Sequence, residues 1–456
     1  MNIQLPPPVR YAMNTLVRAG HQAYVVGGSV RDVLLGKEPH DYDLTTSALP
    51  EEMLELFSRD KMLTNGMKHG TVTLIKYGTA VEMTTFRIDG EYSDGRHPDD
   101  VEFTGNLYED VMRRDLTINA LCWNPQAGLI DYVDGEDDIR NGIIRCVGDA
   151  ERRFSEDALR ILRALRFSAT LDFDIDPSTV QSALHNREAL EAVAVERILV
   201  ETKKLLAGPR AEQVLLEFRP VFEVFLPEVK ALTDDQYMQA ARRVSLTAPA
   251  PDLRLAAFLY GLPAEAIHEC ASRLRFSKAT RKLVEFISEN ASRPLPLNRA
   301  EMRRLIGEVG EEMAYGLIEI READMKAMCH LVIQMSDCVN TKQLAVSAED
   351  VFRAGVSRRK VSPCMSALLD AVIEDRLPNE REALLEAAKE QYASEPQAPG
   401  KKKRRRKKAP AVHGQEAQGD EAVPVNGQGG DASENMLQNE EAGKPDADVP
   451  GEVTSF

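Results

Sequence analysis

The chain has 456 residues, of which 43% are hydrophobic, and a formal net charge of −16 at pH 7. A chain of this length is longer than those that fold around a single hydrophobic core, so we expect two or more domains. No apolar run approaches the ~20 residues of a membrane span, and the first residues lack the basic-then-apolar layout of a secretory signal. The six cysteines form no CxxC pair, so they suggest neither a zinc knuckle nor a disulfide framework and fit a reducing cytoplasm.

The negative net charge argues against a nucleic-acid surface that covers the whole molecule. The charge is unevenly distributed, however. Residues 401–408 read KKKRRRKK, and residues 409–456 contain ten acidic residues and one lysine. Because the preceding 400 residues are acidic overall, any nucleic-acid surface there must be a local patch.

Taken in chain order, the sequence predicts an α+β protein. Residues 1–140 alternate short strand and helix patterns, among them AYVVGG, DYDLTT, TVTLIKY and AVEMTTF, which indicate a small α/β head with a mixed sheet. From 141 to 395 helical periodicity dominates, which predicts an all-α remainder divided into a neck (141–210) and a body and tail (211–395). Residues 396–456 are rich in Gly, Pro, Gln, Ala and Glu, a composition that indicates disorder.

The stretch YVVGGSVRDVLLGKEPHDYDLTT, residues 24–46, carries the strongest chemical signal. Gly27 and Gly28 follow an apolar strand and precede a helix, where backbone N–H groups suit phosphate. Arg31 would add a cation there. Asp41 and Asp43 are two residues apart, so in a strand they point to the same face.

Two such carboxylates repel unless a cation neutralises them. Mg²⁺ prefers one or two carboxylates together with substrate phosphates, and two metals in such a site can assist phosphoryl chemistry. The pattern therefore predicts nucleotidyl transfer, with Asp41 and Asp43 as metal ligands. The alternative for an isolated DxD is a pair of exposed acids at a strand edge. Glu82, in VEMTTFR, is a candidate third carboxylate, with a solvated strand residue as its alternative.

These residues resemble the head of the class II nucleotidyltransferases of the polymerase β superfamily, which comprise tRNA CCA-adding enzymes and bacterial poly(A) polymerases. Three further motifs agree in order: RRDLTINAL (113–121), EDALRILRALRF (156–167) and ERILVE (196–201). The resemblance covers residues 24 to about 205. It implies that the head is catalytic, that the neck recognises the base, and that the body and tail bind tRNA.

The resemblance also implies roles for single residues. Arg114 is suited to phosphate, and Asp115 or Asn119 to ribose hydroxyls, with a structural pairing of Asp115 to an arginine as the competing interpretation. Asp157 and Arg160 would share a helix face and read the base edge, because an acceptor and a planar donor can imitate a pairing base. ERILVE would brace that helix. The nucleotide-binding set comprises Gly27, Gly28, Arg31, Arg114, Asp115, Asn119, Asp157, Arg160, Arg163 and Arg166.

The favoured function is CCA addition to the tRNA 3′ end from CTP and ATP, with Mg²⁺ and release of pyrophosphate. The alternatives are an A-adding enzyme, a poly(A) polymerase, or an RNA-binding protein that kept the fold. The polar stretch 84–103 resembles the flexible loop of CCA-adding and A-adding enzymes, whereas the basic run 401–408 also fits poly(A) polymerases. Candidate RNA-binding cations in the helical part are Arg273, Arg275, Lys278, Arg281, Lys282, Arg358, Arg359 and Lys360.

Overall fold

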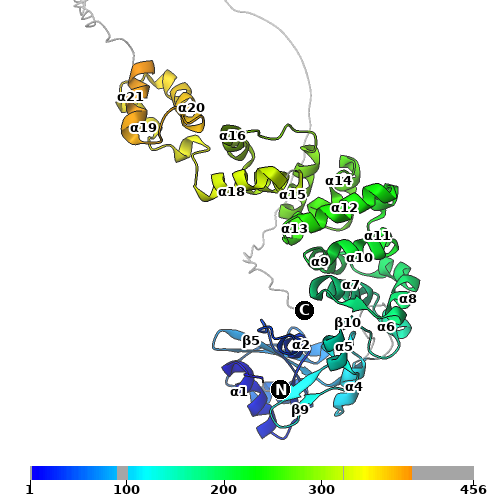
Figure 1. The fold of residues 1–456 in the computed structure, drawn as a ribbon. Coiled ribbons are helices and arrows are strands. Elements are labelled where there is room, and N and C mark those ends of the chain that lie inside the picture. The colour runs from blue at the N-terminus through cyan, green and yellow to red at the C-terminus, as the bar shows by residue number, and fades with distance from the viewer. Residues whose placement is uncertain (1–2, 90–100, 322, 393–456) are drawn as a thin grey trace, which may run out of the picture. The chain divides into compact units, whose positions relative to one another are not determined.

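The structure is a computed structural model that describes residues 3–89, 101–321 and 323–392. The predicted disordered segment 396–456, with its basic run, and the centre of the polar stretch 84–103 lie outside the described residues. Figure 1 shows strands gathered in the N-terminal part of the chain and helices throughout the rest. The predicted α+β class is confirmed.

The head is built around one sheet. In the described residues, seven strands join in the order β3-β4-β5-β2-β1-β8-β9. The pair β2–β5 is parallel and its neighbours are antiparallel, so the sheet is mixed as predicted. The elements are α1 (Pro7–Arg18), β1 (Ala23–Val26), α2 (Gly28–Leu34), β2 (Asp43–Thr46), α3 (Pro50–Leu56), β3 (Lys61–Leu63), η1 (Met67–His69), β4 (Thr71–Lys76), β5 (Thr79–Thr85), β6 (Arg87–Asp89), β7 (Val101–Phe103), α4 (Leu107–Met112), η2 (Thr117–Asn119), β8 (Cys122–Asn124), β9 (Gly128–Ile130) and α5 (Gly135–Asn141).

Different helices pack on the two faces of the sheet. Val25, Leu44 and Trp123 lie in the core cluster that includes Val9 and Met13 of α1. Their strand neighbours Val26 and Cys122 belong to a second cluster, together with Leu107 and Val111 of α4. Because side chains alternate along a strand, α1 and α4 cover opposite faces.

The rest of the described chain is helical, as predicted, except for two strands of two residues each in the neck. Ile143–Ile144 and Asp174–Ile175 pair in parallel. The neck contains β10 (Ile143–Ile144), α6 (Ala150–Glu156), α7 (Leu159–Leu171), β11 (Asp174–Ile175), α8 (Pro177–His185), η3 (Arg187–Ala192) and α9 (Val195–Leu206). The remainder contains α10 (Ala211–Glu217), α11 (Arg219–Phe225), η4 (Pro227–Ala231), α12 (Asp234–Leu246), α13 (Pro251–Leu259), α14 (Ala264–Arg273), α15 (Lys278–Glu289), α16 (Arg299–Val309), α17 (Glu311–Arg321), η5 (Ala323–Met325), α18 (Lys326–Gln334), η6 (Thr341–Gln343), α19 (Ala348–Arg353), α20 (Arg358–Ile373) and α21 (Arg381–Tyr392).

The core is continuous from the head into the neck. The apolar row of α7, Leu159, Leu162 and Leu165, is buried in the same cluster as the α1 side of the sheet. Gly208, after α9, packs on α7: a Cβ there would lie 2.3 Å from the carbonyl oxygen of Ala169. The amide of Arg210 donates to that same oxygen at 3.1 Å. Glycine is therefore required at this position by close backbone approach.

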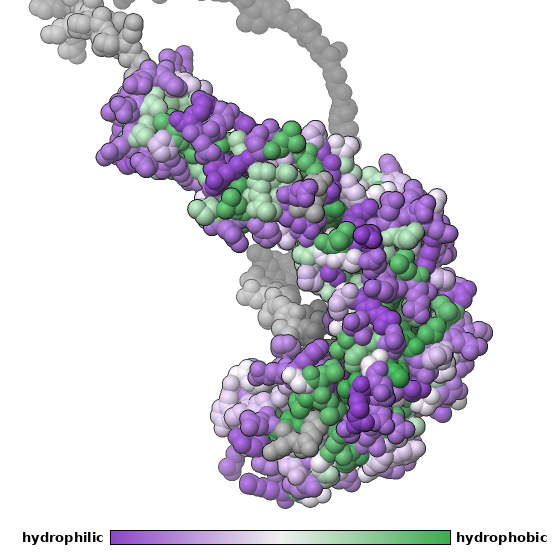
Figure 2. Space-filling model, in the orientation of Figure 1, coloured by the Kyte–Doolittle hydropathy of each residue, from purple (hydrophilic) through white to green (hydrophobic). Residues whose placement is uncertain are grey.

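Hydrophilic residues cover most of the face shown in Figure 2, with hydrophobic residues in small groups between them. Among the residues the structure describes, no helix combines the length and the apolar character needed to cross a membrane.

We expect Gly208→Ala to lower the free energy of unfolding by about 1–3 kcal/mol, because the added methyl group overlaps a backbone oxygen that cannot rotate away. The control is Gly105→Ala, since no atom lies within 4 Å of a Cβ at that glycine. That variant should shift stability by less than about 1 kcal/mol. Urea unfolding followed by circular dichroism measures both changes, and equal midpoints would contradict the packing argument.

Candidate active site

The candidate carboxylates lie on the α4 face of the sheet. Asp43 opens β2 and is paired by register with Glu82 of β5 on one side and with Val26 of β1 on the other. Residues directly opposite each other in neighbouring strands point to the same face, so Asp43 and Glu82 face the same side. Asp41 precedes the strand rather than lying within it, and both aspartates are exposed.

The charge of Asp43 is not compensated. Its side chain is open to solvent, yet protein atoms crowd the remaining sides. This desolvation, followed by the charges of Glu82 and Asp41, raises the pKa of Asp43 to about 6, against an opposing effect of Arg114. The carboxylates of Asp41, Asp43 and Glu82 therefore concentrate negative charge around Asp43, and this suits a cation that prefers oxygen ligands. Among described residues, no cluster of three or more side chains forms a ready metal cage, so substrate oxygens would have to complete the coordination.

The glycine turn has the geometry that the sequence predicted. Gly27 has φ 75° and ψ −132°, a conformation that favours glycine. Arg31 lies close to Gly28 and donates from Nη1 to Oδ1 of Asn119 at 2.6 Å. Its Nε and Nη2 donate to Asp32 at 2.9 and 2.8 Å.

This arrangement leaves a donor unused. Because Oδ1 of Asn119 accepts from Arg31, the amide orientation is fixed and Nδ2 is the free end. Nδ2 is buried and has no hydrogen-bond partner among the described residues. Buried polar groups normally have partners, so Asn119 presents a donor for a ligand oxygen beside the glycine turn.

Asp110 is a residue that the sequence analysis missed. Its carboxylate, in the first turn of α4, is fully buried and accepts from Arg113 at 2.7 and 2.9 Å and from Arg114 at 2.9 Å. It also accepts from the hydroxyl of Thr45 at 3.0 Å. The spacing of Asp110 three and four residues before two arginines was a signal for this pairing.

Asp115 is paired with an arginine, as the competing interpretation held. Nε of Arg163 donates to Oδ2 of Asp115 at 2.7 Å, and the amide of Leu116 donates to Oδ1 at 2.8 Å. Burial opposes ionisation, but Arg163, together with Arg160 and the amide of Leu116, outweighs it and lowers the pKa of Asp115 to about 2. Each oxygen retains an unused lone pair, so this pairing is compatible with a ribose contact.

Three guanidinium groups surround the ring of Phe167 on α7. Those of Arg31, Arg163 and Arg166 lie 5.0, 5.7 and 3.8 Å from its centroid. Arg166 also lies 2.9 Å from Glu201 of the ERILVE motif. Desolvation, opposed by Glu201 and reinforced by Arg163, lowers the pKa of Arg166 to about 10. Each of these guanidinium groups also has a carboxylate partner, which is Asp32, Asp115 or Glu201, so ion pairs hold the cluster in place.

The expected helix face carrying Asp157 and Arg160 is wrong in detail. Helix α7 begins at Leu159, and Asp157 has extended backbone before it. Its Oδ1 accepts the amide of Leu159 at 3.0 Å, and its Oδ2 accepts from Arg197 at 2.9 Å. A carboxylate that bonds the first free amides of a helix favours such an extended position over a helical one.

The side chain of Arg160 also points elsewhere. Its Nη1 donates to Glu156 at 2.6 Å, and its Nη2 donates to the carbonyl of Arg113 at 3.2 Å. The Arg197 contact links ERILVE to Asp157, which is the bracing that the motif predicted.

The candidate RNA-binding cations divide into two groups. Arg273, Arg275 and Arg281 pair with Glu228, Glu196 and Glu285 respectively. The others are exposed: Lys278, Lys282, Arg358, Arg359 and Lys360. Their role in RNA binding stays a prediction.

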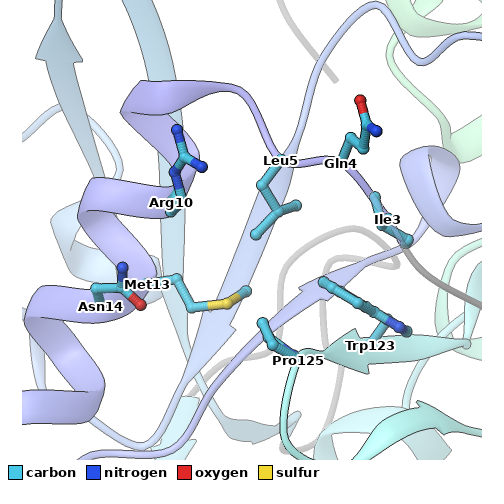
Figure 3. Close-up of a pocket in the computed structure, with 8 residues that line it drawn as sticks. All are labelled: Ile3, Gln4, Leu5, Arg10, Met13, Asn14, Trp123 and Pro125. Carbon is cyan, nitrogen blue, oxygen red and sulfur yellow. The ribbon is translucent and has the colours of Figure 1, made fainter.

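A cavity of about 550 Å³ lies elsewhere in the head (Figure 3). It is lined by Ile3, Gln4, Leu5, Arg10, Met13, Asn14, Trp123 and Pro125. Trp123 packs on the α1 side of the sheet, opposite to Asp43. None of the predicted site residues lines this cavity.

Comparison with known proteins agrees with this geometry. The family described as Poly A polymerase head domain matches residues 23–145, and the one described as "Probable RNA and SrmB- binding site of polymerase A" matches residues 172–232. The CCA-adding enzyme of Levilactobacillus brevis is 36% identical over 396 residues, which cover 83% of this chain and 96% of that enzyme. The chain belongs to the CCA-adding enzyme family. The CCA-adding enzyme of Geobacillus stearothermophilus is 35% identical over 395 residues, with the same coverage.

Solved structures of CCA-adding enzymes share the fold. The Bacillus stearothermophilus CCA-adding enzyme in complex with CTP matches with a TM-score of 0.66 and 29% identity, over 85% of this chain and 98% of that one. The Thermotoga maritima CCA-adding enzyme complexed with tRNA has a TM-score of 0.60 at 21% identity, over 84% and 95% of the two chains, and shows the fold alone. The predicted resemblance to class II nucleotidyltransferases is confirmed.

We expect Asp43→Asn to stabilise the protein at pH 7.5 in the presence of a chelator. The raised pKa means that ionising Asp43 costs more in the folded chain than in the unfolded one, so stability is lost as the pH rises from about 4 to about 6. Asparagine removes that cost. The measurement is the melting temperature of both proteins at pH 4 and pH 7.5.

At pH 4, where the folded wild type keeps this carboxyl protonated, the two melting temperatures should nearly coincide. A variant that melts below the wild type at pH 7.5 would show that Asp43 has a compensating partner.

Proposed function

We propose that this protein adds C, C and A to the 3′ end of tRNA. The 3′-hydroxyl attacks the α-phosphorus of CTP or ATP, a new phosphodiester bond forms, and pyrophosphate leaves with its bond to the α-phosphorus broken. The observation that carries the proposal is the identity with a CCA-adding enzyme along 96% of that enzyme's length. The grouping of the predicted motif residues around one face of the head supports it.

Asp41 and Asp43 are the proposed ligands of Mg²⁺, and Glu82 adds negative charge beside them. The fit rests on the uncompensated charge at Asp43 and on the oxygen-only donor set. When bound, the metal would activate the attacking hydroxyl and stabilise the leaving oxygen. The protein contributes the pairing of β2 with β5, which fixes Asp43 level with Glu82.

The triphosphate and sugar would lie between the glycine turn and the side chains of Arg114 and Asp115. Gly28 allows close approach, while Arg31 and Arg114 supply positive charge. The buried, unused amide of Asn119 donates to a phosphate or sugar oxygen. Asp115, ionised and held by Arg163, accepts from a ribose hydroxyl.

Base selection is assigned to Asp157. Both of its oxygens are held, by the amide of Leu159 and by Arg197, so the carboxylate has one orientation and still has acceptor capacity. It can accept from the exocyclic amino group that cytosine and adenine share. Arg160 is bonded to Glu156 and to main-chain carbonyls, so as a base contact it requires a rotamer change.

The cytoplasm is the proposed compartment, because all six cysteines are free and buried. The tRNA body is assigned to the helical part, where the exposed cations Lys278, Lys282, Arg358, Arg359 and Lys360 are candidates for phosphate contacts.

The deciding experiment offers the protein a tRNA that lacks its CCA end, with Mg²⁺ and labelled CTP or ATP. We expect incorporation of C, C and then A. Incorporation of A only onto a tRNA ending in CC would identify an A-adding enzyme, and long A tracts would identify a poly(A) polymerase.

Asp41→Ala and Asp43→Ala should each lower the rate roughly 10³-fold or more and leave tRNA binding unchanged, because the carboxylates act on the reacting phosphates.

We expect Asp157→Ala to relax base choice more than it weakens triphosphate binding. Loss of a hydrogen bond to a charged group costs ~1.5–3 kcal/mol, so GTP and UTP should gain relative to CTP. The matched control is Asp149→Ala, since the side chains of Asp149 and Asp157 each accept the backbone amide two residues on, at 3.0 Å. If both variants keep wild-type base choice, the assignment of base reading to Asp157 is wrong.

A further inference from the structure

The carboxylate of Asp110 is completely buried and joins four groups of the head. Oδ1 accepts Nε and Nη2 of Arg113 and, at 3.4 Å, the amide of Arg87 at the start of β6. Oδ2 accepts Nη2 of Arg114 at 2.9 Å and the hydroxyl of Thr45 at 3.0 Å. The ionised form is stabilised by Arg113 and Arg114 against desolvation, which leaves the pKa of Asp110 well below its ordinary value.

The two oxygens serve different neighbours. Through Oδ1 the carboxylate binds Arg113 and the backbone of β6. Through Oδ2 it binds Arg114 and the hydroxyl of Thr45 in β2. Thr45 is two residues after Asp43, so both point to the α4 face of the sheet. Oδ2 is thus the shared acceptor between Arg114 and the strand that carries the candidate metal-binding carboxylate.

Arg114 is the group that this contact orients. Its side chain is half-buried, its Nη2 is committed to Asp110, and its buried Nε has no hydrogen-bond partner among the described residues. Asp110 joins this guanidinium to Thr45 in β2, the strand that opens with Asp43. A guanidinium with one end fixed and one donor unused is suited to a phosphate oxygen.

We infer that Asp110 is a positioning residue for nucleotidyl transfer: it fixes the guanidinium of Arg114 relative to β2, so that the cation and the Asp43 carboxylate meet the triphosphate in one geometry. The inference rests on the proposed function. Asp110 touches neither substrate nor metal and acts through Arg114. A displacement of a catalytic group by ~1 Å can cost roughly 100-fold in rate, so a firm anchor for Arg114 has a measurable effect.

The test is a double-mutant cycle with Asp110→Asn and Arg114→Gln, read as kcat and KM for CTP on a tRNA lacking CCA. Asparagine keeps the size but offers only one acceptor oxygen, so either Arg114 or Arg113 loses its partner. We expect Asp110→Asn to lower kcat/KM roughly 100-fold. Adding Asp110→Asn to Arg114→Gln should cause little further loss, because the anchor acts through that arginine.

The control for general loss of structure is Arg113→Gln, which removes a partner of equal charge from the other oxygen of the same carboxylate. It should lower the melting temperature and leave kcat/KM within about 3-fold of the wild type. Losses from Asp110→Asn and Arg114→Gln that multiply independently would overturn the inference, as would an equal loss of activity in Arg113→Gln.

A second pair of variants applies if Asp110→Asn does not fold. Thr45→Val keeps the branched shape and removes the hydroxyl from Oδ2, whereas Thr84→Val removes a hydroxyl that bonds Thr71 at 2.9 Å. We expect roughly a 10-fold loss of kcat/KM for Thr45→Val and less than about 2-fold for Thr84→Val. Equal effects would overturn the inference. A wild-type protein that incorporates no nucleotide would refute the proposed function instead.

Discussion

The register of β2 against its neighbours is the constraint on which the candidate site depends. β2 pairs with β5 in parallel and with β1 in antiparallel orientation, and these two pairings place Asp43 level with Glu82 and Val26. A slip of one residue would turn every side chain of the strand to the other face. Leu44 would then leave the core beneath α1, and the carboxylate would be buried there without a partner.

Arginine side chains fix the positions of several charged groups of the candidate site. Arg114 acts on Asp43 and is held by Asp110, while Arg163 holds Asp115. Arg31 joins the glycine turn to Asn119 and approaches the ring of Phe167 on the neck helix α7. Buried ion pairs of this kind contribute little net stability compared with apolar packing. These contacts instead fix the position and orientation of each charged side chain.

The neck supplies the proposed base-reading carboxylate, which is held by contacts between helices. Asp157 lies at the junction between α6 and α7 rather than inside a helix, and the contact with Arg197 ties it to α9. Gly208 lets the turn after α9 approach the backbone of α7 closely. The orientation of the base-reading carboxylate therefore depends on packing between helices that are far apart in the sequence.

The sequence by itself determined the family, the α+β class, the mixed sheet and the residues of the glycine turn, because these depend on local periodicity and on short motifs. The sequence could not determine that Asp157 precedes α7. An aspartate three residues before an arginine fits a position inside the helix as well as one just before it. The sequence contained a spacing signal for Asp110, but not the contact with Thr45, which is 65 residues away. Which carboxylates are paired and which remain free was decided by tertiary structure alone, because burial and long-range partners set the energy of each charge.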